Sequence, residues 1–475
     1  MTTDPTLWSA TDQARAIRER RLGSEELLDL FLDRIEHVNP AVNAVCTLDV
    51  HRARLRAHAA DEATVRGESW GPLHGLPITV KDAIVTAGIR STGGAEDLRD
   101  HVPTVDAPAV ASLKAAGAVV FGKTNLPEWS GDWQSFNTMF GTTNNPWALA
   151  RTPGGSSGGA AAAVATGMTS FELGTDIGGS VRVPSAFCGV FGHKPSFGVI
   201  PTLGYLDEPE ARDPARATES DVNTFGPIAR SAEDLRVLLD VLAAPTPERA
   251  SAWRLELPET RRHTLQGLRV AAWIDEPAME IDAVMAGVLH AAVDAAEAAG
   301  AVVDRRRRPD VDAAAAWRLG ARLIGAAVSL HGPDGDGMLH RDWLAMHRER
   351  QRLRLAWDAV FREVDVVLCP VTLLPAFSHL QDGLWSDRVI TVNGQQRRYV
   401  DLEAWPAIVG AAYLPSSAVP VGATPEGLPV GMQVVAPYLH DRRAIAVGGL
   451  LAEACTELGG GYRVPPSIGG TVTVW

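Results

Sequence analysis

Apolar and polar positions alternate between helical and strand spacing along most of the chain. From Ser24 to about His37 the apolar residues recur at helical spacing, which predicts a helix that stops at Asn39-Pro40. A short strand from Ala44 to Leu48 is expected next. After Gly75, short apolar runs bounded by Gly or Pro alternate with helical ones. This alternation is typical of an α/β fold built on one large sheet.

The same rhythm continues to the end of the chain. We expect further strands at residues 78–80, 118–121 and 268–274, and helices that open at Asp106-Pro108, at Ser231 and at Asp282. The last of these helices runs to Ala299 and ends at Gly300. The pattern therefore predicts a single domain over residues 1–475, with a mixed, mostly parallel twisted sheet surrounded by helices.

Two kinds of connection can also be predicted. Asn393-Gly394 lies between two strand-like runs, which is a strong signal for a two-residue hairpin and predicts a surface flap over residues 389–400. Residues 207–223 and 329–337 are polar, contain Gly and Pro and lack periodicity, so we expect loops there.

Charge and composition narrow the classes of partner. A net charge of −13 over 475 residues opposes binding to nucleic acid. The basic run from Arg305 to Arg308 is expected to be a solvated turn. No run of eighteen apolar residues occurs and the N-terminus has no signal-peptide pattern, so we expect no membrane attachment and a cytoplasmic location. The four cysteines are far apart and suit neither disulfides nor a zinc site.

Three segments between residues 73 and 197 carry the candidate chemistry. Lys81 ends the apolar run that starts at Pro77, a position where a charged lysine is costly to bury. Residues 152–159 form a glycine/serine loop that contains Ser156 and leads into an alanine-rich helix. In residues 174–184 two glycines precede Ser180 directly, and paired glycines let backbone N–H groups turn inward. A row of N–H donors beside a serine is what acyl transfer requires.

Together these segments resemble the amidase signature family. The similarity rests on Pro-Ile-Thr-Val-Lys-Asp at 77–82, Gly-Gly-Ser-Ser-Gly-Gly at 154–159 and Asp-Ile-Gly-Gly-Ser-Val-Arg-Val-Pro at 176–184. It extends through residues 121–125, 145–147 and 427–433, so it covers nearly the whole chain.

The resemblance implies a role for each matching position. Ser180 would be the nucleophile, Lys81 the base, and Ser156 a bridging serine that follows a cis peptide bond. The oxyanion hole would consist of the N–H groups of Ile177, Gly178, Gly179 and Ser180, and Ser130 and Gly131 would line the substrate site. No metal or organic cofactor is implied.

The chemistry of this triad sets a condition on Lys81. A serine needs a neighbouring base, and a lysine of ordinary pKa is neutral in fewer than about one molecule in a thousand at pH 7. Burial and hydrogen bonds from the serines should therefore lower the pKa of Lys81. We expect Asp176 and Arg182 to orient the nucleophile's loop, and Ser157 to support Lys81.

The aromatic residues near the substrate segment bear on the choice of substrate. Trp129, Trp133, Phe136 and Met139 favour a bulky apolar or aryl amide, with a carbamate as a related small-molecule substrate, although packing in the core would explain them equally well. A glutamine-hydrolysing amidotransferase subunit that acts with a partner protein, and a catalytically silent relative, stay open as alternatives. Residues 155–159 also fit the G-x-S-x-G elbow of α/β-hydrolases, but no buried strand precedes them. We expect a monomer or a homodimer.

Overall fold

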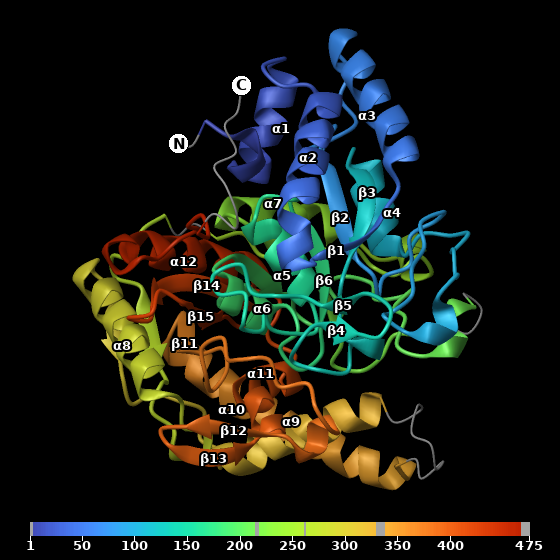
Figure 1. The fold of residues 1–475 in the computed structure, drawn as a ribbon. Helices are drawn as coiled ribbons and strands as arrows, with labels where there is room; N and C mark the ends of the chain where they lie inside the picture. Colours follow the sequence, from blue (N-terminus) through green and yellow to red (C-terminus); the bar gives the residue numbers. More distant parts are fainter. Residues whose placement is uncertain (1–2, 214–217, 261–262, 329–337, 467–475) are drawn as a thin grey trace.

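A computed structural model describes residues 3–213, 218–260, 263–328 and 338–466 (Figure 1). Its largest element is an eight-stranded sheet with the strand order β10-β9-β11-β15-β14-β7-β8-β6. In chain order these strands are β6 (Glu172–Asp176), β7 (Phe191–Lys194), β8 (Thr224–Ala229), β9 (Arg269–Ala272), β10 (Val302–Asp304), β11 (Val366–Pro370), β14 (Ser416–Ala423) and β15 (Pro429–Val435).

The predicted mixed sheet is confirmed, but its strands are not mostly parallel. Only β10–β9 and β9–β11 pair in parallel, and the other five neighbouring pairs are antiparallel. The central pair β14–β15 is a hairpin closed by a short turn in which the Thr424 amide donates to the Leu428 carbonyl at 2.8 Å. Alternation of helices and strands along the sequence does not reveal such a turn, because antiparallel neighbours need no crossover helix.

A second sheet of three strands, in the order β1-β3-β2, continues from the edge of the large one. Its strands are β1 (Val45–Leu48), β2 (Pro77–Lys81) and β3 (Val119–Thr124), and β2 packs beside the edge strand β6. The strands predicted at residues 44–48, 78–80, 118–121 and 268–274 are all present, with ends shifted by up to three residues. The junction of β2 and β6 brings Lys81 close to the segment that precedes Ser180.

Helices cover both faces of the large sheet. Val419 of β14 lies against Gly448 of α12 (Asp441–Ala454), whereas Ala418 packs in a cluster with Ala186 and Phe187 of α6 (Arg182–Cys188). Neighbouring residues of a strand point to opposite faces, so α6 and α12 lie on opposite sides of β14. The sheet is therefore buried on both sides.

The remaining helices gather at the ends of the sheet (Figure 1). Around the three-stranded sheet lie α1 (Ala10–Arg18), α2 (Ser24–Val42), α3 (Val50–Val65) and α4 (Pro108–Ala115). At the opposite end of the molecule lie α9 (Ala313–Ala327), α10 (His340–Glu363), α11 (Ala404–Ala411) and the hairpin of β12 (Val389–Val392) and β13 (Gln395–Arg398). The other elements are α5 (Gly158–Ala165), α7 (Ala232–Leu242), α8 (Ala283–Ala298) and the short strands β4 (Phe136–Asn137) and β5 (Gly141–Thr142).

Helix ends follow the predicted signals in part. Ser231 accepts a hydrogen bond from the Asp234 amide and caps α7, and Asp282 caps α8. The first predicted helix runs to Val42 rather than stopping at Asn39-Pro40, because a proline removes only one N–H donor and the left-handed Asn43 ends the helix instead. Asp106 does not cap α4 and instead accepts from the Ala87 amide and Lys114.

The predicted connections can be compared in the same way. The hairpin at Asn393-Gly394 is confirmed, and its role as a flap stays a prediction. A 3-10 helix at Pro209–Arg212 interrupts the first predicted loop, and residues 329–337 lie outside the described residues. Within the described ranges, no helix has the length and apolar character needed to cross a membrane.

Candidate active site

Lys81 is buried at the end of β2, as its position after an apolar run predicts. Its Nζ donates to Ser156 Oγ at 2.6 Å and to Thr175 Oγ1 at 2.7 Å. Burial lowers the pKa of Lys81 well below its usual value, and the carboxyl groups of Asp176 and Glu172 offset only part of this effect. The surroundings of Lys81 therefore favour its neutral form.

The loop before α5 holds Ser156 against Lys81. The Gly155–Ser156 peptide bond is cis, as the resemblance implies. A side chain at residue 155 would meet the backbone of Asp132 and Gln134 at 2.5 Å, so glycine is required there. The Ser157 amide donates to the Ser180 carbonyl at 3.2 Å and ties this loop to the nucleophile candidate. Lys81 and Ser156 are almost fully buried, and Ser180 is 6% exposed.

Ser157 acts on Lys81 less directly than predicted. Its hydroxyl contacts the backbone of Thr175, donating to the carbonyl and accepting from the amide, each at 3.3 Å. Gly174, the preceding residue of β6, packs so closely that an added Cβ would lie 2.9 Å from Ser157 Oγ. Ser157 therefore fixes Thr175, which in turn accepts the hydrogen bond from Lys81.

Asp176 organises the turn between β6 and α6. Its carboxylate accepts from the amides of Gly179, Val181 and Arg182. It also forms a fully buried ion pair with the Arg182 guanidinium at 2.8 Å. Burial alone would raise the pKa of Asp176, but Arg182 outweighs it and lowers the value to about 2. These contacts hold the turn in place, and the predicted orienting role of both residues in catalysis stays a prediction.

The predicted oxyanion hole needs one correction. The Gly179 amide donates to Asp176 Oδ1 at 2.9 Å, so this donor is committed to the turn. Among the described residues, the amides of Ile177, Gly178 and Ser180 have no hydrogen-bond acceptor outside the strand ladders. A carboxylate that binds several neighbouring amides is a common way to close a tight turn, and the sequence does not show which amide it takes.

Trp133 lies beside the candidate oxyanion hole. Its indole Nε1 donates to the Gly178 carbonyl at 3.1 Å, and its ring meets Trp385 and Tyr399 edge-on. The neighbouring Asp132 accepts from the Tyr399 hydroxyl at 2.5 Å and pairs with Arg388 at 2.6 Å. These contacts join the segment after Trp129 to the hairpin β12–β13 and the residues on either side of it.

Trp129, Ser130 and Gly131 form a short turn in the same segment. Trp129 and Ser130 both have left-handed backbone conformations, with φ of 51° and 58°. The Trp129 amide donates to the Gly93 carbonyl at 2.8 Å, and Gly131 is exposed. Ser130 Oγ is buried beside the Tyr205 hydroxyl and forms no close hydrogen bond among the described residues. Its role in substrate binding stays a prediction.

Several residues near the site were not found from the sequence. Thr175 lies in the segment 174–184, and its hydroxyl next to a strand end was the available signal. Ile324 of α9 and Glu403 lie 3.5 and 3.7 Å from where a Cβ on Gly178 would be. Burial raises the pKa of Glu403 to about 7, and the nearby Asp401 adds to this rise. Gly320, one turn before Ile324, allows α9 to contact Ala407 of α11 closely.

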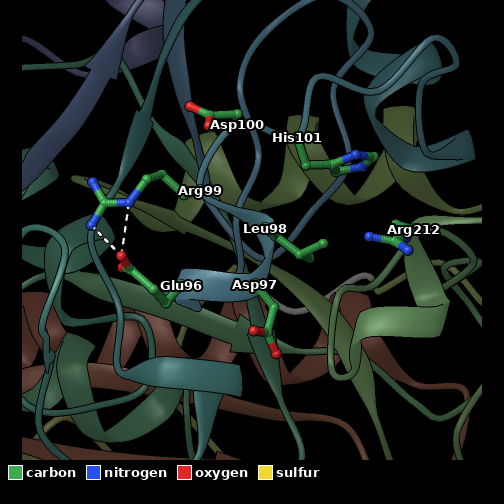
Figure 2. Close-up of a pocket in the computed structure, with 7 residues that line it drawn as sticks. All are labelled: Glu96, Asp97, Leu98, Arg99, Asp100, His101 and Arg212. Carbon is green, nitrogen blue, oxygen red and sulfur yellow. Dashed lines mark hydrogen bonds and ion pairs between the residues drawn. The ribbon is translucent and has the colours of Figure 1, made fainter.

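A surface pocket of about 390 Å³ lies away from these residues (Figure 2). An ion pair between Glu96 and Arg99 borders it, and its walls are mostly charged. None of the residues predicted for catalysis lines it; its lining consists of Glu96, Asp97, Leu98, Arg99, Asp100, His101 and Arg212. Over the described part of the chain, no three His, Cys, Asp or Glu side chains are grouped so as to hold a metal ion.

Known proteins resemble this chain over most of its length. A family model described as Amidase matches residues 26–330 and 317–445. A glutamyl-tRNA(Gln) amidotransferase subunit from Synechococcus sp. (strain CC9902) is 31% identical over 94% of this chain and 96% of its own. Indoleacetamide hydrolase of Bradyrhizobium diazoefficiens is 32% identical over 90% of this chain and 83% of its own length. A solved structure described as an amidase has a TM-score of 0.76 at 28% identity, covering 94% of this chain and 99% of that one.

Proposed function

Since the chain belongs to the amidase family, a family of enzymes that hydrolyse C–N bonds, we propose that it cleaves bulky apolar or aryl amides with Ser180, Ser156 and Lys81. The observation that carries this proposal is the buried Lys81 amine, whose pKa is lowered and whose Nζ lies 2.6 Å from Ser156 Oγ. A lysine in this state is a base at neutral pH.

The proposed reaction uses the three residues in sequence. Ser180 Oγ attacks the amide carbonyl while its proton passes to Ser156, and the proton of Ser156 passes to Lys81 Nζ. The tetrahedral intermediate collapses when Lys81 returns a proton through Ser156 to the leaving nitrogen, and the amine departs. Water then attacks the acyl-Ser180 ester by the same relay and releases the acid.

The turn after β6 stabilises the negative charge in this scheme. The amides of Ile177, Gly178 and Ser180 are the candidate donors to the developing oxyanion, and Trp133 fixes Gly178 through its carbonyl. Asp176 holds the turn rigid through its three amide contacts and Arg182. These N–H donors are already in position before the substrate binds, so the turn does not have to rearrange during the reaction.

The aryl preference rests on the residues around Gly178. Trp133 meets Tyr399 and Trp385 edge-on, and Ile324 completes an apolar border to the same glycine. Aromatic and aliphatic side chains beside a reacting carbonyl suit an aryl or bulky apolar group. The relative named indoleacetamide hydrolase fits this class of substrate. A carbamate presents a similar carbonyl to the same donors and is included in the proposal.

A substrate panel tests this function. We expect turnover of an arylacetamide, an anilide or an aryl carbamate by the purified chain, and loss of that turnover in Ser180→Ala. The Cys455→Ala variant, which changes a buried side chain that contacts Ala292 on α8, is the matched control. If no nitrogen-linked member of the panel is hydrolysed, the proposed substrate class is wrong.

A second candidate function is glutamine hydrolysis with a partner protein. The similarity to a glutamyl-tRNA(Gln) amidotransferase subunit supports it, and the Glu403 carboxyl beside Gly178 is a group that could bind an ammonium. Glutaminase activity measured with and without candidate partner proteins separates the two functions. Robust turnover of glutamine, lost in Glu403→Gln, would favour this second function over the aryl amides.

A further inference from the structure

Glu172 is a buried acid at the start of β6 that the proposed reaction does not use. It is 0% exposed, and the hydroxyls of Thr79 and Thr124 lie beside its carboxylate without forming a close hydrogen bond to it. Buried polar groups in native proteins are almost always paired, and an unpaired buried carboxylate is especially costly. Its position therefore requires an explanation.

Both of these hydroxyls are buried. Thr79 Oγ1 on β2 and Thr124 Oγ1 on β3 have no close hydrogen bond among the described residues, and Glu172 is the acid next to them. Both residues are close to Lys81: Thr79 precedes it by two positions on the same strand face, and Thr124 is its partner in the β2–β3 register. Three groups with unsatisfied oxygens thus meet where β2, β3 and β6 come together.

Positive charges face this group from the neighbouring strands. Burial raises the pKa of Glu172 to about 7, while the hydroxyls of Thr79 and Thr124 and the ammonium of Lys123 limit the rise. The acidic groups of Asp82 and Cys46 raise the pKa of Lys123, and Asp176 raises the pKa of Lys81. The other elements packed on β6, namely β8 and α5, contain no titratable side chain.

We propose that Glu172 is a positioning residue that holds a buried water with Thr79 and Thr124, and that its carboxylate controls how firmly Lys81 keeps a proton. A water at this point would have three polar partners, the usual number for a buried water. The inference rests on the proposed role of Lys81 as the base. Glu172 touches no reacting atom and acts only through Lys81.

The direction of the effect follows from charge. An ionised Glu172 stabilises the protonated form of Lys81 and raises its pKa, against the lowering caused by burial. Removing that charge lowers the pKa of Lys81, so that the neutral amine persists to lower pH. The acid limb of the reaction should therefore move to lower pH when Glu172 is replaced by an uncharged side chain.

The test measures how fast a fluorophosphonate labels Ser180 between pH 5 and 10. In this reaction Ser180 Oγ bonds to phosphorus, fluoride leaves, and the proton of Ser180 passes through Ser156 to Lys81. We expect Glu172→Gln to move the midpoint of the acid limb to lower pH by about one pH unit. A midpoint equal to that of the unaltered protein would overturn the proposal.

The matched control is Asp234→Asn. Asp234 is another buried acid whose pKa is raised by burial, but it bonds to Thr11 near the N-terminus. The Asp234→Asn variant should leave the midpoint of the acid limb unchanged. A shift equal to that of Glu172→Gln would overturn the proposal as well. Labelling does not depend on which amide is the substrate, so a protein that is labelled but cleaves no amide would contradict the proposed function alone.

A second variant covers the case in which Glu172→Gln does not fold. Thr124→Val removes one hydroxyl beside Glu172 and keeps the side-chain shape. Because that hydroxyl stabilises the carboxylate, its loss favours the protonated form of Glu172. We expect a smaller movement of the midpoint in the same direction, and no movement would overturn the proposal. A crystal structure should show a water within hydrogen-bond distance of Glu172, Thr79 and Thr124, and a collapsed, dry cavity would contradict it.

Discussion

Lys81 can act as a base only while it is uncharged, and its surroundings favour that state. The amine is fully buried, and its two acceptors are hydroxyls that do not require a cation. A carboxylate in hydrogen-bond contact would have kept the lysine protonated. The contacts of this one side chain therefore decide whether the relay can work at neutral pH.

Replacing Lys81 by methionine tests this point. We expect kcat for an aryl amide to fall by about 10²- to 10⁴-fold, because the base is lost while its volume is kept. The melting temperature should stay equal or rise, since a buried amine is costly. Steady-state kinetics and thermal unfolding measure the two effects. Full activity would refute the relay.

Asp176 links the stability of the fold to the shape of the turn that presents Ser180. In Asp176→Asn the buried Arg182 loses its counter-charge, so we expect the free energy of unfolding to fall by about 3–5 kcal/mol. Urea denaturation measures the change. The exposed pair of Asp29 with Arg54 provides the control, because Asp29→Asn should cost no more than about 1 kcal/mol.

The pH dependence of unfolding follows from the same residue. The pKa of Asp176 is lowered to about 2 in the fold, so its stabilising contribution is present above its ordinary value of 3.8 and is lost as the pH falls toward 2. Asp176→Asn should lack this part of the acid dependence. An unchanged slope of the unfolding free energy between pH 4 and pH 2 would contradict this account.

At the scale of elements, the hairpin β12–β13 and the residues on either side of it brace the segment that carries Trp133. The hairpin turn is held by Asn393, whose side chain donates to Glu280 and accepts from the Ala283 amide. At the other end, Arg388 and Tyr399 both bind Asp132. The hairpin is thus fixed at both ends.

Tyr399→Phe removes one of these braces. We expect kcat/KM for an arylacetamide to fall by about tenfold, because a hydrogen bond to a charged group contributes about 1.5–3 kcal/mol. For acetamide, which does not reach the aromatic residues, the fall should be smaller. Tyr438→Phe, which loses a contact to the Phe197 carbonyl, serves as the control. Equal losses for both substrates would show that Tyr399 does not contribute to aryl recognition.

The sequence predicts elements well where the signal is local. Lys81, Ser156 and Ser180 lie in short motifs, and caps such as Ser231 and Asp282 act within one turn. Ile324 and Glu403 reach Gly178 only through packing of segments more than 140 residues away, and no periodic pattern marks such contacts. The predominance of antiparallel pairs was missed for the same reason, since pairing is decided between strands rather than within them.

On the scale of the whole molecule, the net charge bears on the choice between the two candidate functions, because one of them involves transfer RNA. The net charge of −13 and the pairing of Arg305 with Asp294 and Glu297 weaken any attraction of the basic run at 305–308 for a polyanion. We expect the purified chain to bind transfer RNA more weakly than about 100 µM at low salt, measured by filter binding. A parallel titration with a basic RNA-binding protein checks the assay. Tight, saturable binding would favour the amidotransferase function.

The close approach of α9 and α11 offers a way to alter the surroundings of Gly178 from a distance. A methyl group at Gly320 would lie 2.7 Å from the Ala407 carbonyl, so even alanine must push the two helices apart. Ile324 is one turn further along α9 and would move outward with it, enlarging the space beside Gly178. Substrate size could thus be tuned through helix spacing, with every residue of the relay left in place.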